Sequence, residues 1–125
     1  MSTIAVDTLT KADGSQSVTS SAFAKAWANL DGNETTPTLR DSYNVSSITD
    51  SATGKPTFNF TNSMSDANYG VPSSVTRDLT SPASSAHFNQ TISVSAGSYQ
   101  PQTTLAGTGA IDCDEVVIAT YGDLA

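Results

Sequence analysis

The stretch that most constrains the fold runs from residue 40 to residue 60 and reads R-D-S-Y-N-V-S-S-I-T-D-S-A-T-G-K-P-T-F-N-F. It contains two extended runs, Tyr43–Ile48 and Pro56–Phe60, joined by the polar turn Thr49–Lys55, which holds a glycine. Polar and apolar residues alternate in these runs, as they do in a strand that buries one face. The stretch therefore predicts a β-hairpin with one face turned toward a core.

The first run of this hairpin is not regular along its whole length. Tyr43 and Val45 have the same parity, so we expect both on one face, whereas Ile48 has the opposite parity. One extra residue in a strand shifts the alternation in this way. We therefore expect a β-bulge near Ser46–Ser47.

Composition extends the β reading to the whole chain. Ser and Thr make up 37 of the 125 residues, and only 14% of the residues are charged. This suits strands and turns, because surface helices usually carry Glu, Lys and Arg. We expect five to seven strands in a jelly-roll-like antiparallel β-sandwich over residues 22–125, preceded by an N-terminal arm at residues 1–21.

Two later segments predict strands of different kinds. In His87–Val94, the residues Phe88, Ile92 and Val94 share one face, which indicates a half-buried strand. Asp112–Tyr121 is apolar on both faces at its centre, which indicates a central or doubly covered strand. We also expect a short strand at residues 68–71 and a loop at residues 96–105.

The segment at residues 20–31 fits two interpretations. Phe23, Trp27 and Leu30 fall on one helical face, and the many alanines favour a helix of about three turns. A strand would instead place Phe23, Lys25 and Trp27 on one face and alternate alanines on the other. Local propensity favours the helix.

The N-terminal arm carries Ile4, Val6 and Leu9 at near-alternating positions, followed by a run that is rich in Ser and Thr. Such an arm is either disordered or docked on another subunit, and the apolar triplet favours docking. Large apolar residues are few for a monomeric core of this length. That indicates either a thin, loop-rich fold or a core completed by neighbouring copies.

The charge balance excludes some partners. The net charge is −7 and the five basic residues are scattered, whereas a nucleic-acid binder needs a basic patch to displace counterions from phosphate. The sequence has no apolar run of membrane-spanning length, so we expect no membrane insertion. It also has no secretion signal, so we expect the chain to be synthesised in a cytoplasm. A single cysteine excludes an internal disulfide and a Cys-based zinc site.

No group of residues predicts catalysis or a cofactor. The single histidine, His87, lies in S-S-A-H-F-N-Q without a nucleophile elbow, and we expect a surface or packed side chain. Asp112, Asp114 and Glu115 form the densest acidic cluster, but a calcium loop needs more oxygen ligands and a turn glycine. Cys113 is expected as a small buried residue. We therefore expect neither metal nor cofactor and no enzymatic activity.

The aromatic residues allow two interpretations. Trp27, Tyr43, Tyr69 and Tyr99 could line a carbohydrate platform, although core or interface packing is the safer expectation. We expect Trp27, Tyr43 and Arg40 at an interface and Tyr99 as a receptor contact. Arg40 is also expected to form a local ion pair with Asp41 or an interface contact.

Several strings in the chain resemble a module of tailed-phage virion proteins. The module has the pattern K-A-W-x-N, then R-D-S-[FY]-N-V-S-S-I-T-D, then [FV]-N-F-T and M-x-D-A-N-Y-x-V, and it ends in a hydrophobic strand. The middle string is specific, and the match covers roughly residues 22–121, with a departure over residues 72–109. The matching segments are Lys25–Gly32, Arg40–Asp50, Phe58–Thr61, Met64–Val71 and Val116–Ala119.

The resemblance implies a β-rich and trimeric terminal domain of a phage tail fibre or a related virion protein, in which Lys25–Leu30 is a strand. It brings no catalytic residues. We expect a virion structural protein that contacts itself and other phage virion proteins of the tail, baseplate or capsid. Two alternatives remain: a capsid decoration protein, and an adhesin that binds a host surface glycan.

Overall fold

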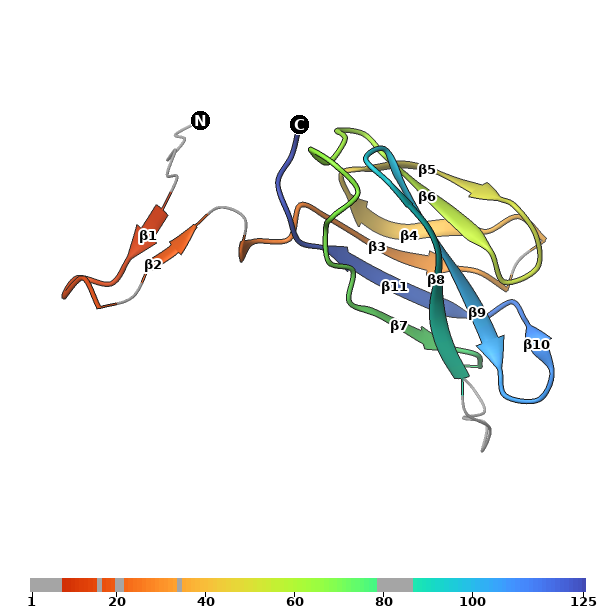
Figure 1. The fold of residues 1–125 in the computed structure, drawn as a ribbon. Helices are drawn as coiled ribbons and strands as arrows, with labels where there is room; N and C mark the ends of the chain where they lie inside the picture. Colours follow the sequence, from red (N-terminus) through yellow and green to blue (C-terminus); the bar gives the residue numbers. More distant parts are fainter. Residues whose placement is uncertain (1–7, 16, 20–21, 34, 79–86) are drawn as a thin grey trace.

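A computed structural model of the chain describes residues 8–15, 17–19, 22–33, 35–78 and 87–125. Two antiparallel sheets pack against each other, and a two-stranded hairpin lies apart from them near the N-terminus (Figure 1). The β-sandwich expected from the sequence is confirmed, but the expected number of five to seven strands is too low, because its two described sheets have four and five strands. The strands are β1 (Thr8–Thr10), β2 (Ser17–Thr19), β3 (Ala26–Asp31), β4 (Thr38–Tyr43), β5 (Val45–Asp50), β6 (Pro56–Phe60), β7 (Ser73–Thr76), β8 (His87–Ser95), β9 (Ser98–Leu105), β10 (Gly109–Ala110) and β11 (Glu115–Thr120).

The first sheet has the order β4-β3-β11-β7. Strand β3 lies between two partners, and Ala26, Ala28 and Leu30 point inward and are fully buried. Residues 26–31 are therefore a strand, as the resemblance implies, and the helix favoured by propensity is wrong. Pairing on both sides and burial of every second residue outweigh the helix preference of alanine. Strand β11 is central, as its apolar pattern predicted.

The second sheet has the order β10-β9-β6-β5, with β8 paired along the other side of β9. The expectation of a loop at residues 96–105 is wrong, because β9 is the strand that joins this sheet together. Proline lacks the N–H that a ladder needs and so suggests a loop. Here Pro101 lies between the residues of β9 that pair with β6 and those that pair with β10, so that side of the strand has no partner at the proline.

A bulge in β8 changes which of its residues face the core. The register of β8 on β9 shifts between Thr91 and Ser93. Ile92 is therefore 48% exposed, while Val94 packs against the core. The expectation that these two residues share a buried face is wrong, because a bulge inserts one unpaired residue and reverses the parity that follows. The strand itself is confirmed.

The core lies between the two sheets and contains few large side chains. Ala26 and Ala28 of β3 belong to the same buried cluster as Phe58 and Tyr99 of the second sheet. The short strand expected at residues 68–71 is reduced to one bridge between Gly70 and Tyr121. The largest fully buried side chains include Tyr99, Phe58, Leu30, Met64, Ile118 and Val116.

The hairpin of β5 and β6 is confirmed, and so is its bulge, which shifts the register between Val45 and Ser47. The sequence predicted one extended run over Tyr43–Ile48, but the structure divides this run between two strands. Strand β4 belongs to the first sheet and β5 to the second, and only Asn44 separates them. Asn44 has a φ of 56°, the left-handed conformation that asparagine adopts more readily than most residues. The chain turns a corner at this residue.

This corner separates two residues that were expected to share a face. Tyr43 is 57% exposed on the outside of the first sheet, whereas Val45 is 9% exposed in the core of the second. The expectation is wrong because strand alternation holds only within one continuous strand. A left-handed residue between the two strands resets it.

Four side-chain hydrogen bonds hold the corner in place. The Asn44 amide nitrogen donates to the carbonyl oxygens of Lys25 and Asn62, each at 3.0 Å. Its amide oxygen accepts from the backbone N–H of Asn62 at 2.7 Å and from the Asn62 side chain at 3.1 Å. One side chain thus ties the start of β3, in the first sheet, to the segment that leaves β6, in the second.

Tyr69 closes the end of the sandwich next to this corner. Its ring is 9% exposed and meets Phe60 edge to face at a centroid distance of 5.8 Å. Its hydroxyl lies 3.0 Å from the Ser95 carbonyl oxygen and 2.8 Å from that of Ser98. Burial, followed by the proximity of Tyr99, raises the pKa of Tyr69 to about 12.

The first prediction concerns the corner. Asn44→Ala should lower the free energy of unfolding by about 3 kcal/mol, since the four largely exposed hydrogen bonds contribute about 0.5 kcal/mol each and a left-handed alanine costs about 1 kcal/mol. Asn44→Gly should cost about 1 kcal/mol less, because glycine adopts this φ freely. Urea unfolding measures both values. Asn33→Ala, at an exposed asparagine, is the control. An equal loss of unfolding free energy in Asn44→Ala and Asn33→Ala would show that the Asn44 corner does not stabilise the fold.

The second prediction concerns pH. The pKa of Tyr69 is about 12 in the folded protein, whereas its ordinary value, which applies to the unfolded chain, is 10.0. The unfolded state then binds fewer protons between these values, so stability should fall as pH rises from 10 toward 12. Tyr69→Phe should make that decline shallower, and Tyr43→Phe is the matched control. An unchanged slope in Tyr69→Phe would show that Tyr69 does not cause the decline.

Candidate functional site

Two aromatic side chains stand on the outside of the first sheet. Trp27 on β3 and Tyr43 on β4 are directly opposite each other in the antiparallel register. They are 38% and 57% exposed, although aromatic rings of this size usually bury most of their surface. The outward side of β4, β3, β11 and β7, called the outer face below, therefore presents an uncovered aromatic pair.

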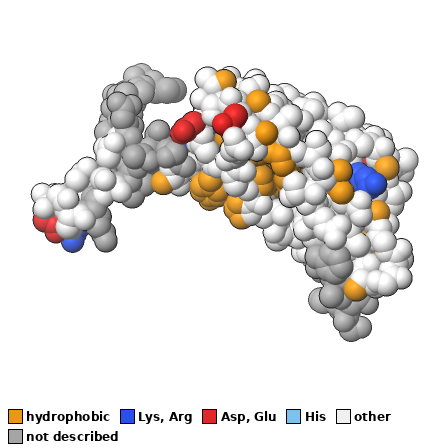
Figure 2. Space-filling view, in the orientation of Figure 1, with side chains coloured by type: hydrophobic (Ala, Val, Ile, Leu, Met, Phe, Trp, Pro, Cys, Tyr) orange, Lys and Arg blue, Asp and Glu red, His pale blue; other side chains and the backbone are white. Residues whose placement is uncertain are grey.

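The apolar surface continues from this pair across the sheet. Ala119 on β11 lies opposite Trp27, and its backbone N–H donates to the Pro72 carbonyl oxygen at 3.1 Å. A shallow hollow of about 270 Å³ is lined here mainly by apolar atoms of β11 and the start of β7, including Val117, Ala119 and Pro72. Figure 2 shows hydrophobic side chains gathered where β3 begins and β11 ends. Trp27, Tyr43, Val117, Ala119 and Pro72 form the apolar half of the outer face.

The other half of the outer face is a row of polar side chains that crosses all four strands. Arg40 donates to Asp31 Oδ2 at 2.6 Å and to Asn29 Oδ1 at 3.3 Å. Asn29 Nδ2 donates to Glu115 Oε1 at 2.9 Å. Thr76 Oγ1 lies 3.5 Å from Glu115 Oε2 and completes the row. These polar groups bond one another.

The two halves differ in what they offer a partner. In the polar half, both polar atoms of the Asn29 side chain are already engaged, and the ion pair of Arg40 and Asp31 is partly exposed and therefore screened by solvent. In the apolar half, more than a third of the Trp27 surface and more than half of the Tyr43 surface remain in contact with water. The outer face thus gains most from a partner that covers apolar surface.

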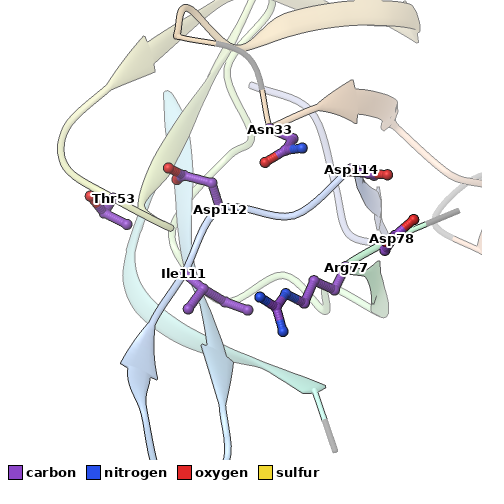
Figure 3. A pocket seen from close by; sticks show the side chains of 7 residues that line it. All are labelled: Asn33, Thr53, Arg77, Asp78, Ile111, Asp112 and Asp114. Atoms are coloured by element: carbon purple, nitrogen blue, oxygen red, sulfur yellow. The ribbon is translucent and has the colours of Figure 1, made fainter. Parts of the chain in front are cut away.

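A second, polar hollow lies at one end of the sandwich, where several loops meet (Figure 3). It measures about 600 Å³ and opens to solvent. The loops that build it lie between β3 and β4, between β5 and β6, after β7, and between β10 and β11. Its lining residues are Asn33, Thr53, Arg77, Asp78, Ile111, Asp112 and Asp114.

Gly54 fixes one wall of this hollow. Its N–H donates to Asp112 Oδ1 at 2.7 Å, and its carbonyl oxygen accepts from the Thr103 N–H at 2.8 Å. The Thr103 hydroxyl donates to the Ile111 carbonyl oxygen. Gly54 has a φ of 65°, and a Cβ placed there would lie 2.5 Å from that Ile111 oxygen. The position therefore admits only glycine without movement of its neighbours.

The acidic residues of the hollow do not converge. Figure 3 shows Asp112 directed toward the β5–β6 turn and Asp114 directed away from it. Glu115 is the first residue of β11, and its side chain lies on the outer face. Among the described residues, no three His, Cys, Asp or Glu side chains are placed to hold one metal ion.

Cys113 is buried beside this hollow, as expected. Its sulfur lies 4.0 Å from the Ile111 carbonyl oxygen. Burial raises the pKa of the thiol, so the thiolate that a nucleophile or a metal ligand requires is disfavoured. The residue packs as a small apolar group.

The structure brings together some of the residues expected at an interface. Trp27 and Tyr43 are neighbours, and Arg40 lies on the same sheet, although it pairs with Asp31 and not with Asp41. The Asp41 carboxylate accepts instead from the N–H of the next residue, Ser42. Sequence proximity suggested the wrong partner, because the register of β4 on β3 shifts beside Arg40 and its guanidinium reaches across to Asn29 and Asp31 of β3.

The expectation for Tyr99 is corrected. Its side chain is 1% exposed in the core, and its hydroxyl lies 3.2 Å from the Thr91 hydroxyl. A buried ring presents no surface to a receptor. Tyr69 is buried as well, so only Trp27 and Tyr43 remain of the four candidate platform residues.

The remaining expected residues are placed as follows. Ile4 and Val6 lie outside the described residues, and Leu9 lies in β1, opposite Val18 of β2. His87 begins β8. Within the described residues, no helix is long and apolar enough to cross a membrane.

Comparisons with protein-family models, with curated proteins and with solved structures gave no match.

Sequence reasoning missed the hollow beside Trp27. Val117 and Ala119 belong to a strand that is apolar on both faces, and such a strand is usually covered on both sides. Among the described residues, the second sheet lies against the inner side of β11, and on the outer side Val117 and Ala119 are half-buried. The apolar outward residues of β11 were therefore the signal for an uncovered surface.

The third prediction tests how tightly the loop end is built. Gly54→Ala should destabilise the fold by about 3 kcal/mol, because it adds backbone strain to a clash with two carbonyl oxygens. Gly107→Ala is the matched control, since Gly107 also has a positive φ but nothing within 4 Å of its Cβ position. We expect a cost of about 1 kcal/mol there. Equal losses in thermal unfolding would mean that Gly54 is not closely packed.

Proposed function

We propose that this chain is a non-enzymatic structural protein of a tailed-phage virion. It acts as a tail-fibre-like module that contributes to particle assembly by contact with copies of itself and with other virion proteins. The outer face carries this proposal, because it combines an uncovered apolar half with a polar half that is already hydrogen-bonded. Surfaces of this kind favour protein partners.

The positions of the resemblance strings support the proposal. The string at residues 40–50 contains the Asn44 corner, and the string at residues 25–32 contains β3, which holds both the core alanines and Trp27. The string at residues 64–71 supplies Met64 and Tyr69 to the core. The residues that carry the resemblance are those that build this sandwich, so it concerns a structural scaffold.

A capsid decoration protein is the first alternative, because the same face would serve on a head or on a tail. The loop-end hollow favours a second candidate, an adhesin that binds a host glycan. Its amide, hydroxyl, guanidinium and carboxylate groups are of the types that exchange hydrogen bonds with sugar hydroxyls. On the outer face the polar groups beside Trp27 bond one another, which makes that surface less suited to sugars.

The fourth prediction locates the protein. Purified particles are incubated with an antibody against this chain and imaged by negative-stain electron microscopy. Labelling on tails is expected, and labelling on heads would favour the decoration alternative. Absence of label from both, with an antibody that binds the denatured protein from the same particles, would contradict both structural functions.

A further inference from the structure

The segment between β10 and β11 is tied to each of the other three loops around the polar hollow at the end of the sandwich. The Gly32 N–H, in the loop after β3, donates to the Cys113 carbonyl oxygen at 3.1 Å. The Asp114 N–H donates at 3.0 Å to the carbonyl oxygen of Arg77, which follows β7. The β5–β6 turn donates to the Asp112 carboxylate, as described above. One segment therefore fixes every loop of the hollow.

Two of these ties depend on glycine. A Cβ at Gly32 would lie 2.8 Å from the Cys113 carbonyl oxygen, and one at Gly54 would lie 2.5 Å from that of Ile111. The two glycines therefore allow their loops to approach the segment more closely than residues with a side chain would. Because backbone contacts hold the walls of the hollow, these walls need little ordering when a ligand binds, and binding costs less free energy.

The lining combines groups of opposite charge. It holds three carboxylates, of Asp78, Asp112 and Asp114, and one guanidinium, of Arg77, so its net charge is −2. This charge and the net charge of −7 on the chain repel a phosphate, a sulfate or an acidic sugar. An organic cation is attracted by the carboxylates but is repelled by the guanidinium in the same hollow. A neutral ligand avoids both repulsions.

The hydrogen-bonding groups of the lining fit a ligand with many hydroxyls. Carboxylates only accept and a guanidinium only donates, whereas a sugar hydroxyl does both. Hydrogen bonds to the charged groups are stronger than those between neutral groups. Asn33 and Thr53 add an amide and a hydroxyl from two other loops. Figure 3 shows the Arg77 side chain extending toward Ile111, whose apolar surface can contact the C–H groups of a sugar ring.

We propose that this hollow binds a neutral saccharide. The inference rests on the second candidate function above, that of an adhesin, and is independent of the outer face. It adds the chemical class of the glycan, which carries no carboxylate, sulfate or phosphate group. It also adds the side chains that contact the glycan, which are those of Asn33, Thr53, Arg77, Ile111 and Asp112.

The shape of the hollow sets the expected strength of binding. Its volume of about 600 Å³ lies within the range of about 300–1,000 Å³ that ligand pockets occupy. It opens to solvent, and none of the described residues that line it is aromatic, so water competes for its hydrogen bonds and little apolar surface is buried. We expect a dissociation constant of about 1 mM for one site. Several copies on one particle raise the apparent affinity through multivalency.

The fifth prediction tests the ligand class and the site together. Isotope-labelled protein is titrated with neutral disaccharides of glucose, galactose, mannose and N-acetylglucosamine, each to about 20 mM, and amide chemical shifts are recorded by NMR. At least one disaccharide should shift the amides of Thr53, Arg77 and Asp112 and leave that of Trp27 on the outer face unchanged. Sialyllactose is the acidic counterpart of lactose. Acidic sugars should bind about 5-fold more weakly than their neutral counterparts, because the lining repels them.

Two variants test the named side chains. Arg77→Met removes the guanidinium, and Asn33→Ala removes the amide of another loop. Each should raise the dissociation constant by about 5-fold or more, the loss expected for one hydrogen-bonding group. Both residues are exposed, so thermal unfolding should be unchanged. Lys11→Met is the matched control, because it removes the same charge at an exposed residue of the N-terminal hairpin and should leave sugar binding unchanged.

Three results would overturn the inference: no shift with any neutral disaccharide at about 20 mM, shifts confined to the outer face, or equal binding by the acidic sugars. Unchanged binding in both Arg77→Met and Asn33→Ala would also remove the assigned site. Particle labelling is independent of these results. Labelled tails without sugar binding would remove the inference and keep the virion function, and sugar binding without labelled particles would do the reverse.

Discussion

The corner at Asn44 is the constraint on which the rest of the sandwich depends. Strand β4 lies in one sheet and β5 in the other, so the pattern of inward and outward side chains must change at the single residue between them. Few residues adopt the left-handed backbone that this change requires. The four side-chain hydrogen bonds of Asn44 also fix the corner to the start of β3 and to the chain after β6. Because of this reversal, Tyr43 faces solvent while Val45 enters the core.

The same reversal makes the outer face. With Tyr43 turned outward beside Trp27, the first sheet carries an aromatic pair that is partly exposed. The polar row from Arg40 to Thr76 spans the sheet and satisfies its own hydrogen bonds. Binding is therefore stabilised mainly by burial of the apolar half of the outer face. A protein surface of complementary shape provides that burial.

Local pattern was sufficient for elements whose alternation is regular. The β5–β6 hairpin, its bulge and the central strand β11 followed from parity and turn residues. Strand β9 was missed because Pro101 suggests a loop unless one knows that its unpaired side lies in a gap between β6 and β10. The orientation of Tyr43 was missed because nothing local distinguishes a left-handed Asn44 from an extended one.

The candidate site was predictable in part for the same reasons. Trp27 and Tyr43 were expected at an interface from residue type, and they are exposed neighbours. Tyr99 has the same residue type as Tyr43, and only the second sheet determines that it is buried. Hydroxyl-radical labelling of Trp27 in dilute and concentrated protein tests most directly whether the outer face contacts other copies of the chain. We expect protection of Trp27, but not of Ile92, as the protein concentration rises, and equal labelling of Trp27 at all concentrations would contradict a contact through the outer face.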